Sequence, residues 1–260
     1  LEKSKTEINH LISNIKLNNS VEVQLNSIMK MNNLIAEYSS YEAIAELNFN
    51  RDINSEAYKA EKDYYDNISP NFDDLKNQFS QALMKSTFLP ELKSKLGEHY
   101  FNIKEVEQKT FNPKIIDLLK KEIELENEYT ELIAGAKISF RDKSYNLAGL
   151  TPFHTDQNRN TRKESYKARF SFFDKNSEKL DSLYDRMVKL RTKIAKELGF
   201  KNYIELGYYR LGRTDYGSKE VANFRKQIVD YIVPLVQKLN IKKKAVLGLD
   251  HLYFYDGVLF

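Results

Sequence analysis

The chain has 260 residues, of which 41% are hydrophobic and 30% are charged, and its formal net charge is +4. This apolar content excludes a fully disordered chain, and the mild charge excludes a dedicated nucleic-acid binder. The absence of cysteine excludes disulfides, thiolate nucleophiles and cysteine-ligated metals, and it fits a reducing cytoplasm. No segment is apolar enough to span a membrane, and the first ten residues lack the features of a signal peptide. The sequence starts at Leu1 and stops at Phe260, just after an aromatic run, and we expect both ends to be cut.

Residues 1–111 are expected to form helical hairpins, because glycine and proline are scarce and apolar residues recur at spacings of three and four. A second helix is expected after Ser20, whose side chain suits the N-cap position. Pro70 is expected to kink or end a third helix, and Pro90 and Gly97 suit the start and the end of a shorter one. The residues expected to face the core in the first two helices are Ile8, Leu11, Ile12, Ile15, Val23, Ile28, Met31, Leu34 and Ile35.

Residues 112–176 are expected to contain a helix, a β-hairpin and another helix. Asn112 is followed by proline, a typical helix start, and Gly135 suits the left-handed position after the helix end. The period then changes to two between residues 136 and 148, which predicts a small hairpin with its turn near Asp142. The apolar stripe of the preceding helix consists of Ile115, Leu118, Leu119, Leu125, Tyr129 and Leu132.

Residues 177–260 return to the helical period. One helix is expected from Ser177 to Gly199, a shorter one follows, and a third opens at Ser218 and is bent by Pro234. From Leu247 the sequence reads as a loop that leads into a strand. The residues expected to face the core are Leu180, Leu183, Tyr184, Met187, Leu190, Ile194 and Leu198 in the first helix, and Val221, Phe224, Ile228, Ile232, Leu235 and Leu239 in the third. We therefore predict a mainly α fold, about three-quarters helix.

The segment Gly207–Thr214 has the glycine spacing of a phosphate-binding P-loop, with Arg213 in place of its lysine. A P-loop follows a buried apolar strand, whereas a helix is expected here. We therefore interpret Gly212 as a helix C-cap followed by a polar turn, and we expect no nucleotide binding.

The four histidines, His10, His99, His154 and His251, are too dispersed to place two imidazoles on one zinc ion through a local helical motif. A serine–histidine–aspartate site assembled across the fold stays open, but no nucleophile-elbow motif points to one. Acidic pairs on helix faces are poor acid–base catalysts without burial or a partner. We place Glu122 and Glu124 on such a solvent face.

Two groups of charged residues have competing interpretations. The basic run of Lys238 and residues 242–244 is interpreted as a solvated helix end rather than a nucleic-acid surface. The second group is arginine-rich and has two interpretations: clamping of one helix against another, which we favour, or capture of a substrate carboxylate. Its members are Asp156, Arg159, Arg162, Glu164 and Arg169, with a similar mixture at Arg210, Arg213 and Asp215.

From residue 146 onwards the sequence resembles oligoendopeptidase F, in the thimet-oligopeptidase class of zinc metallopeptidases. The matching pieces are NLAGLTPF at 146–153, the stretch 156–162, MVKLRTKIAKELGFKNYIELGYYRLGRTDY at 187–216, VANFRKQIVDYIVPL at 221–235, and LGLDHLYFYD at 247–256. The first 110 residues are similar to the family only in their layout of long helical hairpins.

The resemblance implies a nearly all-helical shell around a channel that admits short peptides. It also implies a zinc ion held by two histidines of an H-E-x-x-H helix and a downstream glutamate, with the motif's glutamate activating a metal-bound water. These residues are expected beyond Phe260, so no catalytic, cofactor-binding or metal-binding residue is assigned in this chain. The expected domains are the N-terminal hairpins at 1–111, a helix–hairpin–helix module at 112–176, and the truncated beginning of the metallopeptidase domain at 177–260.

Two functions remain open from the sequence. In the first, the chain is the N-terminal lobe of a peptidase, and its partners are short peptides and the C-terminal catalytic part of the same chain, with no nucleic acid and no membrane. In the second, it is a free-standing helical interaction module without zinc. In the first case we also expect an apolar surface around Phe254, Tyr255 and Phe260, which would normally meet the C-terminal half.

Overall fold

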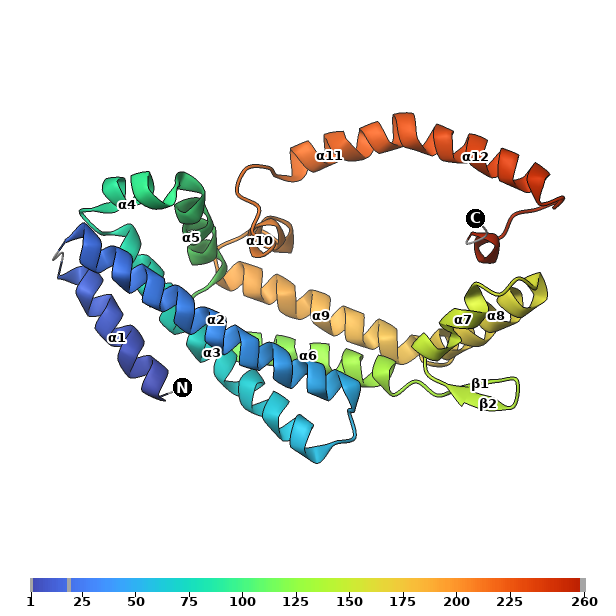
Figure 1. Cartoon of the computed structure of the whole chain (residues 1–260), viewed down its shortest axis with the longest axis horizontal. Coiled ribbons are helices and arrows are strands. Elements are labelled where there is room, and N and C mark those ends of the chain that lie inside the picture. Colours follow the sequence, from blue (N-terminus) through green and yellow to red (C-terminus); the bar gives the residue numbers. More distant parts are fainter. Residues whose placement is uncertain (1, 18–19, 258–260) are drawn as a thin grey trace. The chain divides into compact units, whose positions relative to one another are not determined.

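The protein is mainly helical, as the ribbon in Figure 1 shows. We describe it from a computed structural model, which describes residues 2–17 and 20–257. It is 80% helical with one small antiparallel sheet in the part described, so the predicted mainly α fold with a β-hairpin is confirmed. The chain divides into two compact units, Leu1–Asn127 with Arg186–Asp215, and Glu128–Asp185 with Tyr216–Phe260, which we call unit 1 and unit 2.

Unit 1 is built from helices. Helix α6 begins in this unit and ends in unit 2, and α9 begins in unit 2 and ends here. The elements are α1 (Glu2–Lys16), α2 (Val21–Arg51), α3 (Glu56–Met84), α4 (Leu89–Leu96), α5 (Glu98–Thr110), the 3-10 turn η1 (Pro113–Ile115), α6 (Ile116–Ala134), α9 (Ser177–Glu197) and α10 (Tyr203–Arg210).

The first core of unit 1 forms where α1, α2 and α3 pack together. All four apolar residues predicted for α1 are buried in it, and Ser20 caps α2 by accepting a hydrogen bond from the Val23 amide at 3.2 Å. The inward placement of Val23 was wrong, because its side chain is exposed and the neighbouring Gln24 is buried instead. Gln24 donates to the carbonyl of Ile15 at 3.1 Å and accepts from the Ser86 hydroxyl at 2.6 Å. A buried amide is therefore part of this core.

A second core in unit 1 joins the start of α6 to the end of α9 and to α10. Its buried members are Ile115, Leu118, Ile194, Ala195 and Leu206. Gly199 ends α9 with a φ of +88°, as predicted. On the same helix, however, Tyr184 is 73% exposed, so its predicted core position was wrong.

Some of the predicted helix ends are confirmed, and others are wrong. Helix α4 begins at Leu89, just before the expected proline, and Gly97 ends it with a φ of +86°. Pro70 lies inside α3, which continues to Met84. Gly135 follows α6 but does not adopt a positive φ, so the expected left-handed position was wrong.

Unit 2 contains the hairpin and two sets of helices. Its elements, besides parts of α6 and α9, are β1 (Ile138–Phe140), β2 (Lys143–Tyr145), the 3-10 turn η2 (Ala148–Leu150), α7 (Thr151–His154), α8 (Arg159–Lys175), α11 (Ser218–Gln227), the π-helical turn η3 (Ile228–Ile232), α12 (Val233–Val246) and the 3-10 turn η4 (Phe254–Asp256). A small core lies under the hairpin, with Ala136, Ile138, Phe140, Leu147 and Leu150 buried in it.

The hairpin turns within two residues, because Phe140 pairs with Lys143 across it. Arg141 and Asp142 adopt φ values of +50° and +61°, the backbone of a type I′ turn that glycine and asparagine normally favour. The Arg141 guanidinium donates to the hydroxyl of Thr161 at 2.6 Å. This contact ties the strained turn to α8.

Helices α11 and α12 differ from their prediction. Val221 is partly buried, but the other five residues expected to face a core are exposed. Pro234 lies in the first turn of α12, directly after the π-helical turn η3, and the bend expected there stays a prediction. The predicted strand after Leu247 was also wrong, because the described residues there form a loop and η4. In η4, Tyr255 is buried and Phe254 is exposed, so only Phe254 fits the expected apolar surface; Phe260 lies outside the described residues.

No helix within residues 2–17 and 20–257 is both long and apolar enough to cross a membrane.

Candidate functional site

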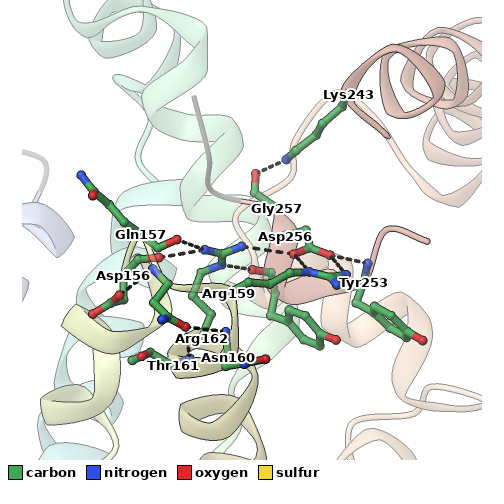
Figure 2. A network of polar contacts seen from close by, with 12 residues as sticks. Asp156, Gln157, Arg159, Asn160, Thr161, Arg162, Lys243, Tyr253, Asp256 and Gly257 are labelled. Carbon is green, nitrogen blue, oxygen red and sulfur yellow. Dashed lines mark hydrogen bonds and ion pairs between the residues drawn. The ribbon is translucent and has the colours of Figure 1, made fainter. Parts of the chain in front are cut away.

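The most connected polar cluster in unit 2 joins the start of α8 to η4, as Figure 2 shows. Asn158 caps α8, since its side-chain oxygen accepts from the amides of Asn160 at 2.9 Å and Thr161 at 3.2 Å. This cap fixes the first turn of the helix. Arg159 and Arg162 lie one turn apart there, so both side chains reach the same neighbour.

That neighbour is Asp256, which is 1% exposed. Arg159 donates to both carboxylate oxygens at 2.9 Å, Arg162 donates to one at 3.2 Å, and the amide of Tyr253 donates to the other at 2.9 Å (Figure 2). The hydrogen bonds from Arg159 in particular, with those from Tyr253 and Arg162, hold the pKa of Asp256 well below its usual range, despite burial. Asp256 is therefore ionised at neutral pH.

Arg162 is itself 2% exposed and spends its remaining donors on the backbone. It donates to the carbonyls of Tyr255 at 2.8 Å, Asp156 at 2.8 Å and Gln157 at 3.1 Å (Figure 2). Each of the three guanidinium nitrogens of Arg162 donates to an acceptor in its own chain, and the group is buried, so it is not available to a substrate carboxylate. The contacts thus favour the clamping interpretation, although the clamped element is η4 and not a second long helix.

The side chains of the other charged residues in the predicted group contact neither Asp256 nor Arg162. Glu164 pairs loosely with Arg141 at 3.8 Å, Arg169 donates to the carbonyl of Leu147 at 3.3 Å, and the Asp156 side chain accepts from the Asn158 amide at 2.7 Å. The sequence reasoning missed Asp256, whose only signal was its place in the matching piece LGLDHLYFYD.

A second cluster lies in unit 1 around Glu122. The placement of Glu122 on a solvent face was wrong, because its side chain is 6% exposed. It accepts from Arg191 at 2.6 Å and from Arg210 at 2.9 Å through each oxygen, and Arg191 also pairs with Glu126 at 2.9 Å. Burial, reinforced by the charge of Glu122, raises the pKa of Glu126. Arg210 thus clamps α10 to α6. Arg213 does not join this cluster, since its guanidinium lies over the ring of Tyr208 at 4.4 Å.

The remaining candidates do not assemble into a site. His10, His99 and His251 are exposed, and His154 is buried against the ring of Tyr166 at 4.0 Å. Among the described residues, no three histidine, aspartate or glutamate side chains could hold a metal ion together. The residues described here therefore do not fit a zinc ion.

The glycine-spaced segment and the basic run also have local explanations. Leu211 is the C-cap of α10, and Gly212 follows it with a φ of +66°, so a helix does end here, with the glycine one position beyond the C-cap. Helices α9 and α10 precede it where a P-loop would have a strand. In the basic run, Lys238 and two of the three following lysines are exposed at the end of α12, and Lys243 donates to the carbonyl of Gly257 at 3.0 Å.

Comparison with known proteins identifies the family. The family model of the Peptidase M3 N-terminal domain matches residues 1–111, and that of Peptidase family M3 matches residues 153–258. No curated protein matches the chain.

Solved structures match almost the whole chain. A structure of Pz peptidase A with an inhibitor is 39% identical, with a TM-score of 0.94, over 99% of this chain and 46% of that one. A structure assigned as oligoendopeptidase F from Bacillus anthracis strain Ames is 35% identical, with a TM-score of 0.92, over 99% of this chain and 47% of that one. The chain therefore spans about half the length of these structures. It belongs to the M3 family of peptidases, and its fold is that of the N-terminal part of oligoendopeptidase F.

Proposed function

We propose that this chain supplies the scaffold and one wall of the substrate channel in a zinc-dependent oligoendopeptidase that hydrolyses short peptides. Its zinc ligands and catalytic glutamate are contributed by sequence C-terminal to Phe260. Family membership supports the peptidase class, and coverage of only 46% of a related structure supports a contribution from further sequence.

The observation that carries this proposal is the exposed apolar surface of α11, η3 and α12. A helix with apolar residues all round is normally buried. Here large side chains at successive positions are exposed over more than four turns, so water covers surface that a folded protein usually buries. The exposed residues are Phe224, Ile228, Val229, Tyr231, Ile232, Val233, Leu235, Val236, Leu239, Ile241 and Val246. We assign this surface to contact with the C-terminal part of the same protein.

The chemistry of the described residues agrees with the proposal that the zinc ligands come from sequence outside this chain. A catalytic zinc needs about three converging protein ligands and one open position. The histidines do not converge, and the two carboxylates with the most partners, Asp256 and Glu122, are each held by two arginines. The division into domains at 1–111, 112–176 and 177–260, a cytoplasmic location and the absence of nucleic-acid and membrane partners all stay predictions.

The direct test compares the 260-residue chain with a longer chain that continues the same reading frame. We expect the longer chain to retain about one zinc ion and to cleave a quenched fluorescent peptide of roughly ten residues, and the shorter chain to do neither. Metal-dependent cleavage by the shorter chain would contradict the proposal. An inactive longer chain without zinc would favour the free-standing interaction module.

A matched pair of substitutions tests the contact surface itself. Leu239→Asn should lower the free energy of unfolding of the longer chain by about 2–4 kcal/mol if α12 is buried there, and Lys238→Asn should change it by less than about 0.5 kcal/mol. In the 260-residue chain both changes should be small, because both side chains are exposed. Equal effects of the two substitutions in the longer chain would show that α12 has no such partner.

A further inference from the structure

A cavity of about 240 Å³ lies between α1, α2 and α3 in unit 1. Cavities for drug-sized ligands usually measure about 300–1,000 Å³, so this one suits a smaller molecule. No step of the proposed function uses it. Four tyrosines line the cavity together with two carboxylates, and these residues are Tyr38, Tyr41 and Glu37 from α2, Tyr64 and Tyr65 from α3, and Glu7 from α1.

Three of the four tyrosine rings are held at steep angles to one another. The ring of Tyr65 meets that of Tyr38 at 72°, with centroids 5.7 Å apart, and that of Tyr64 at 83°, with centroids 5.3 Å apart. Tyr38 is fixed in turn, because its ring stacks on Phe72 at 3.9 Å and its hydroxyl shares a hydrogen bond of 2.9 Å with Ser69. The aromatic wall is therefore organised before any ligand binds, which lowers the entropic cost of binding.

The fourth ring, Tyr41, is open to a ligand. Its side chain is 56% exposed, and no ring or cation from the described residues lies over it. Tyr64 is 51% exposed, so the cavity can be reached from solvent along both α2 and α3. A cation placed over the face of a tyrosine is attracted by the quadrupole of the ring, and several rings around one point form an aromatic cage for quaternary ammonium groups.

The charges of the lining also favour a cation. Glu7 and Glu37 are exposed, and neither forms an ion pair with a residue that the structure describes. No described lysine or arginine lines the cavity, so its lining is negative. The described residues provide no third acidic or histidine ligand at this point, which disfavours a metal ion, since such ions need several converging ligands.

We propose that this cavity binds a small organic cation of the quaternary-ammonium type, with its methyl groups against the tyrosine rings and its charge near Glu7 and Glu37. A phosphate attached to the cation would be repelled by the same carboxylates. The preferred ligand is therefore a free cation and not a phosphocholine headgroup. Helices α1, α2 and α3 supply the whole cavity, so the proposal does not depend on the proposed peptidase function.

The test is an NMR titration of the 260-residue chain with choline. We expect a dissociation constant of about 1–10 mM for a ligand of this size. The neutral molecule of the same shape, 3,3-dimethylbutan-1-ol, should bind at least about fivefold more weakly, because it fills the cavity without a charge. Phosphocholine should bind at least about threefold more weakly than choline.

Two pairs of variants locate the binding. Tyr41→Leu should weaken choline binding at least about threefold, whereas Tyr41→Phe keeps the aromatic face and should change it by less than about twofold. Glu37→Gln should weaken binding about two- to fivefold, and the matched control Glu46→Gln, which is exposed on α2 but outside the cavity, should leave it unchanged. All three positions are exposed, so the four variants should keep the thermal midpoint of the unsubstituted chain.

Three results would overturn the proposal. They are the absence of binding at about 50 mM choline, equal binding of the neutral alcohol, and choline binding that Tyr41→Leu does not weaken. Tighter binding of phosphocholine than of choline would also contradict it, because the ligand would then be a headgroup that carries phosphate.

Discussion

The clamp between α8 and η4 predicts a large effect of Asp256→Asn. The amide has nearly the same size and shape as the carboxylate, so the substitution removes the charge with little change in packing. Arg162 would then be a buried cation with only neutral acceptors, namely three backbone carbonyls and the amide oxygen of the substituted side chain. Arg159 is less affected, because it is 38% exposed and water can solvate it.

The expected magnitude follows from burial. Removing one partner of a fully buried ion pair costs about 3–5 kcal/mol, because the other charge loses its compensation. The matched control is Asp230→Asn in η3. Asp230 forms an exposed ion pair with Lys226 of α11, which contributes about 0.3–0.5 kcal/mol to stability. Both pairs lie in unit 2, so they differ chiefly in exposure.

Hydrogen exchange measures this cost locally. The amides of Asp256 and Gly257, which donate to the carbonyls of Tyr253 and Phe254 at 2.9 and 3.1 Å, report opening of η4. Asp256→Asn should speed their exchange by about two to nearly four orders of magnitude, and Asp230→Asn by less than about threefold. A change of less than tenfold for Asp256→Asn would refute the view that the buried charge pair holds η4 on α8.

Three further predictions follow from the clusters and turns. Glu122→Gln should lower the free energy of unfolding by about 2–3 kcal/mol, because two arginines lose a charged acceptor, whereas the exposed Glu124→Gln should change it by less than about 0.5 kcal/mol; urea titration of both variants checks this. Burial lowers the pKa of His154 below its usual 6.5, so the unfolded chain takes up the proton first and stability should fall as the pH drops through 6.5. His154→Phe should remove this part of the pH dependence in thermal melts from pH 7.5 to 5.5, and an unchanged slope would exclude His154 as its source. Gly212→Ala should lower the free energy of unfolding by about 1 kcal/mol, because of the positive φ alone. Calorimetry of the unsubstituted chain with ATP or GTP and magnesium should show no binding. A micromolar affinity that Gly212→Ala abolishes would contradict the interpretation of this glycine as a helix end.

Local patterns predicted the elements well where they depend on a few neighbouring residues. The α1 stripe is buried because a period of three to four places its residues on one face, and Ser20 caps α2 because its side chain reaches the third residue along the chain. Positions at the edge of a stripe are different. Gln24 lies inside and Val23 outside because the amide of Gln24 donates to the carbonyl of Ile15 in α1 and accepts from the hydroxyl of Ser86 after α3.

The charged clusters required information that periodicity does not contain. The pattern of α6 places Glu122 on a solvent face. Its burial depends on contacts with Arg191 and Arg210, which lie 69 and 88 residues further along the chain. Asp256 likewise becomes the partner of Arg159 and Arg162 only through contacts across more than 90 residues. In α12 the sequence pattern identified the apolar positions, but it does not indicate which protein surface packs against them.

The two cores of unit 1 have consequences for the order of events during synthesis. The first core uses only residues 8–101, so it can close soon after that stretch leaves the ribosome. The second core cannot close at that stage, because Ile115 and Leu118 pack against Ile194 and Leu206, which are synthesised later. Throughout translation of the intervening residues, the apolar side of α6 is exposed to water and to chaperones. Nested truncations ending between residues 140 and 185 should therefore keep a folded N-terminal hairpin bundle followed by a protease-sensitive α6, and protection of α6 should return only once α10 is included.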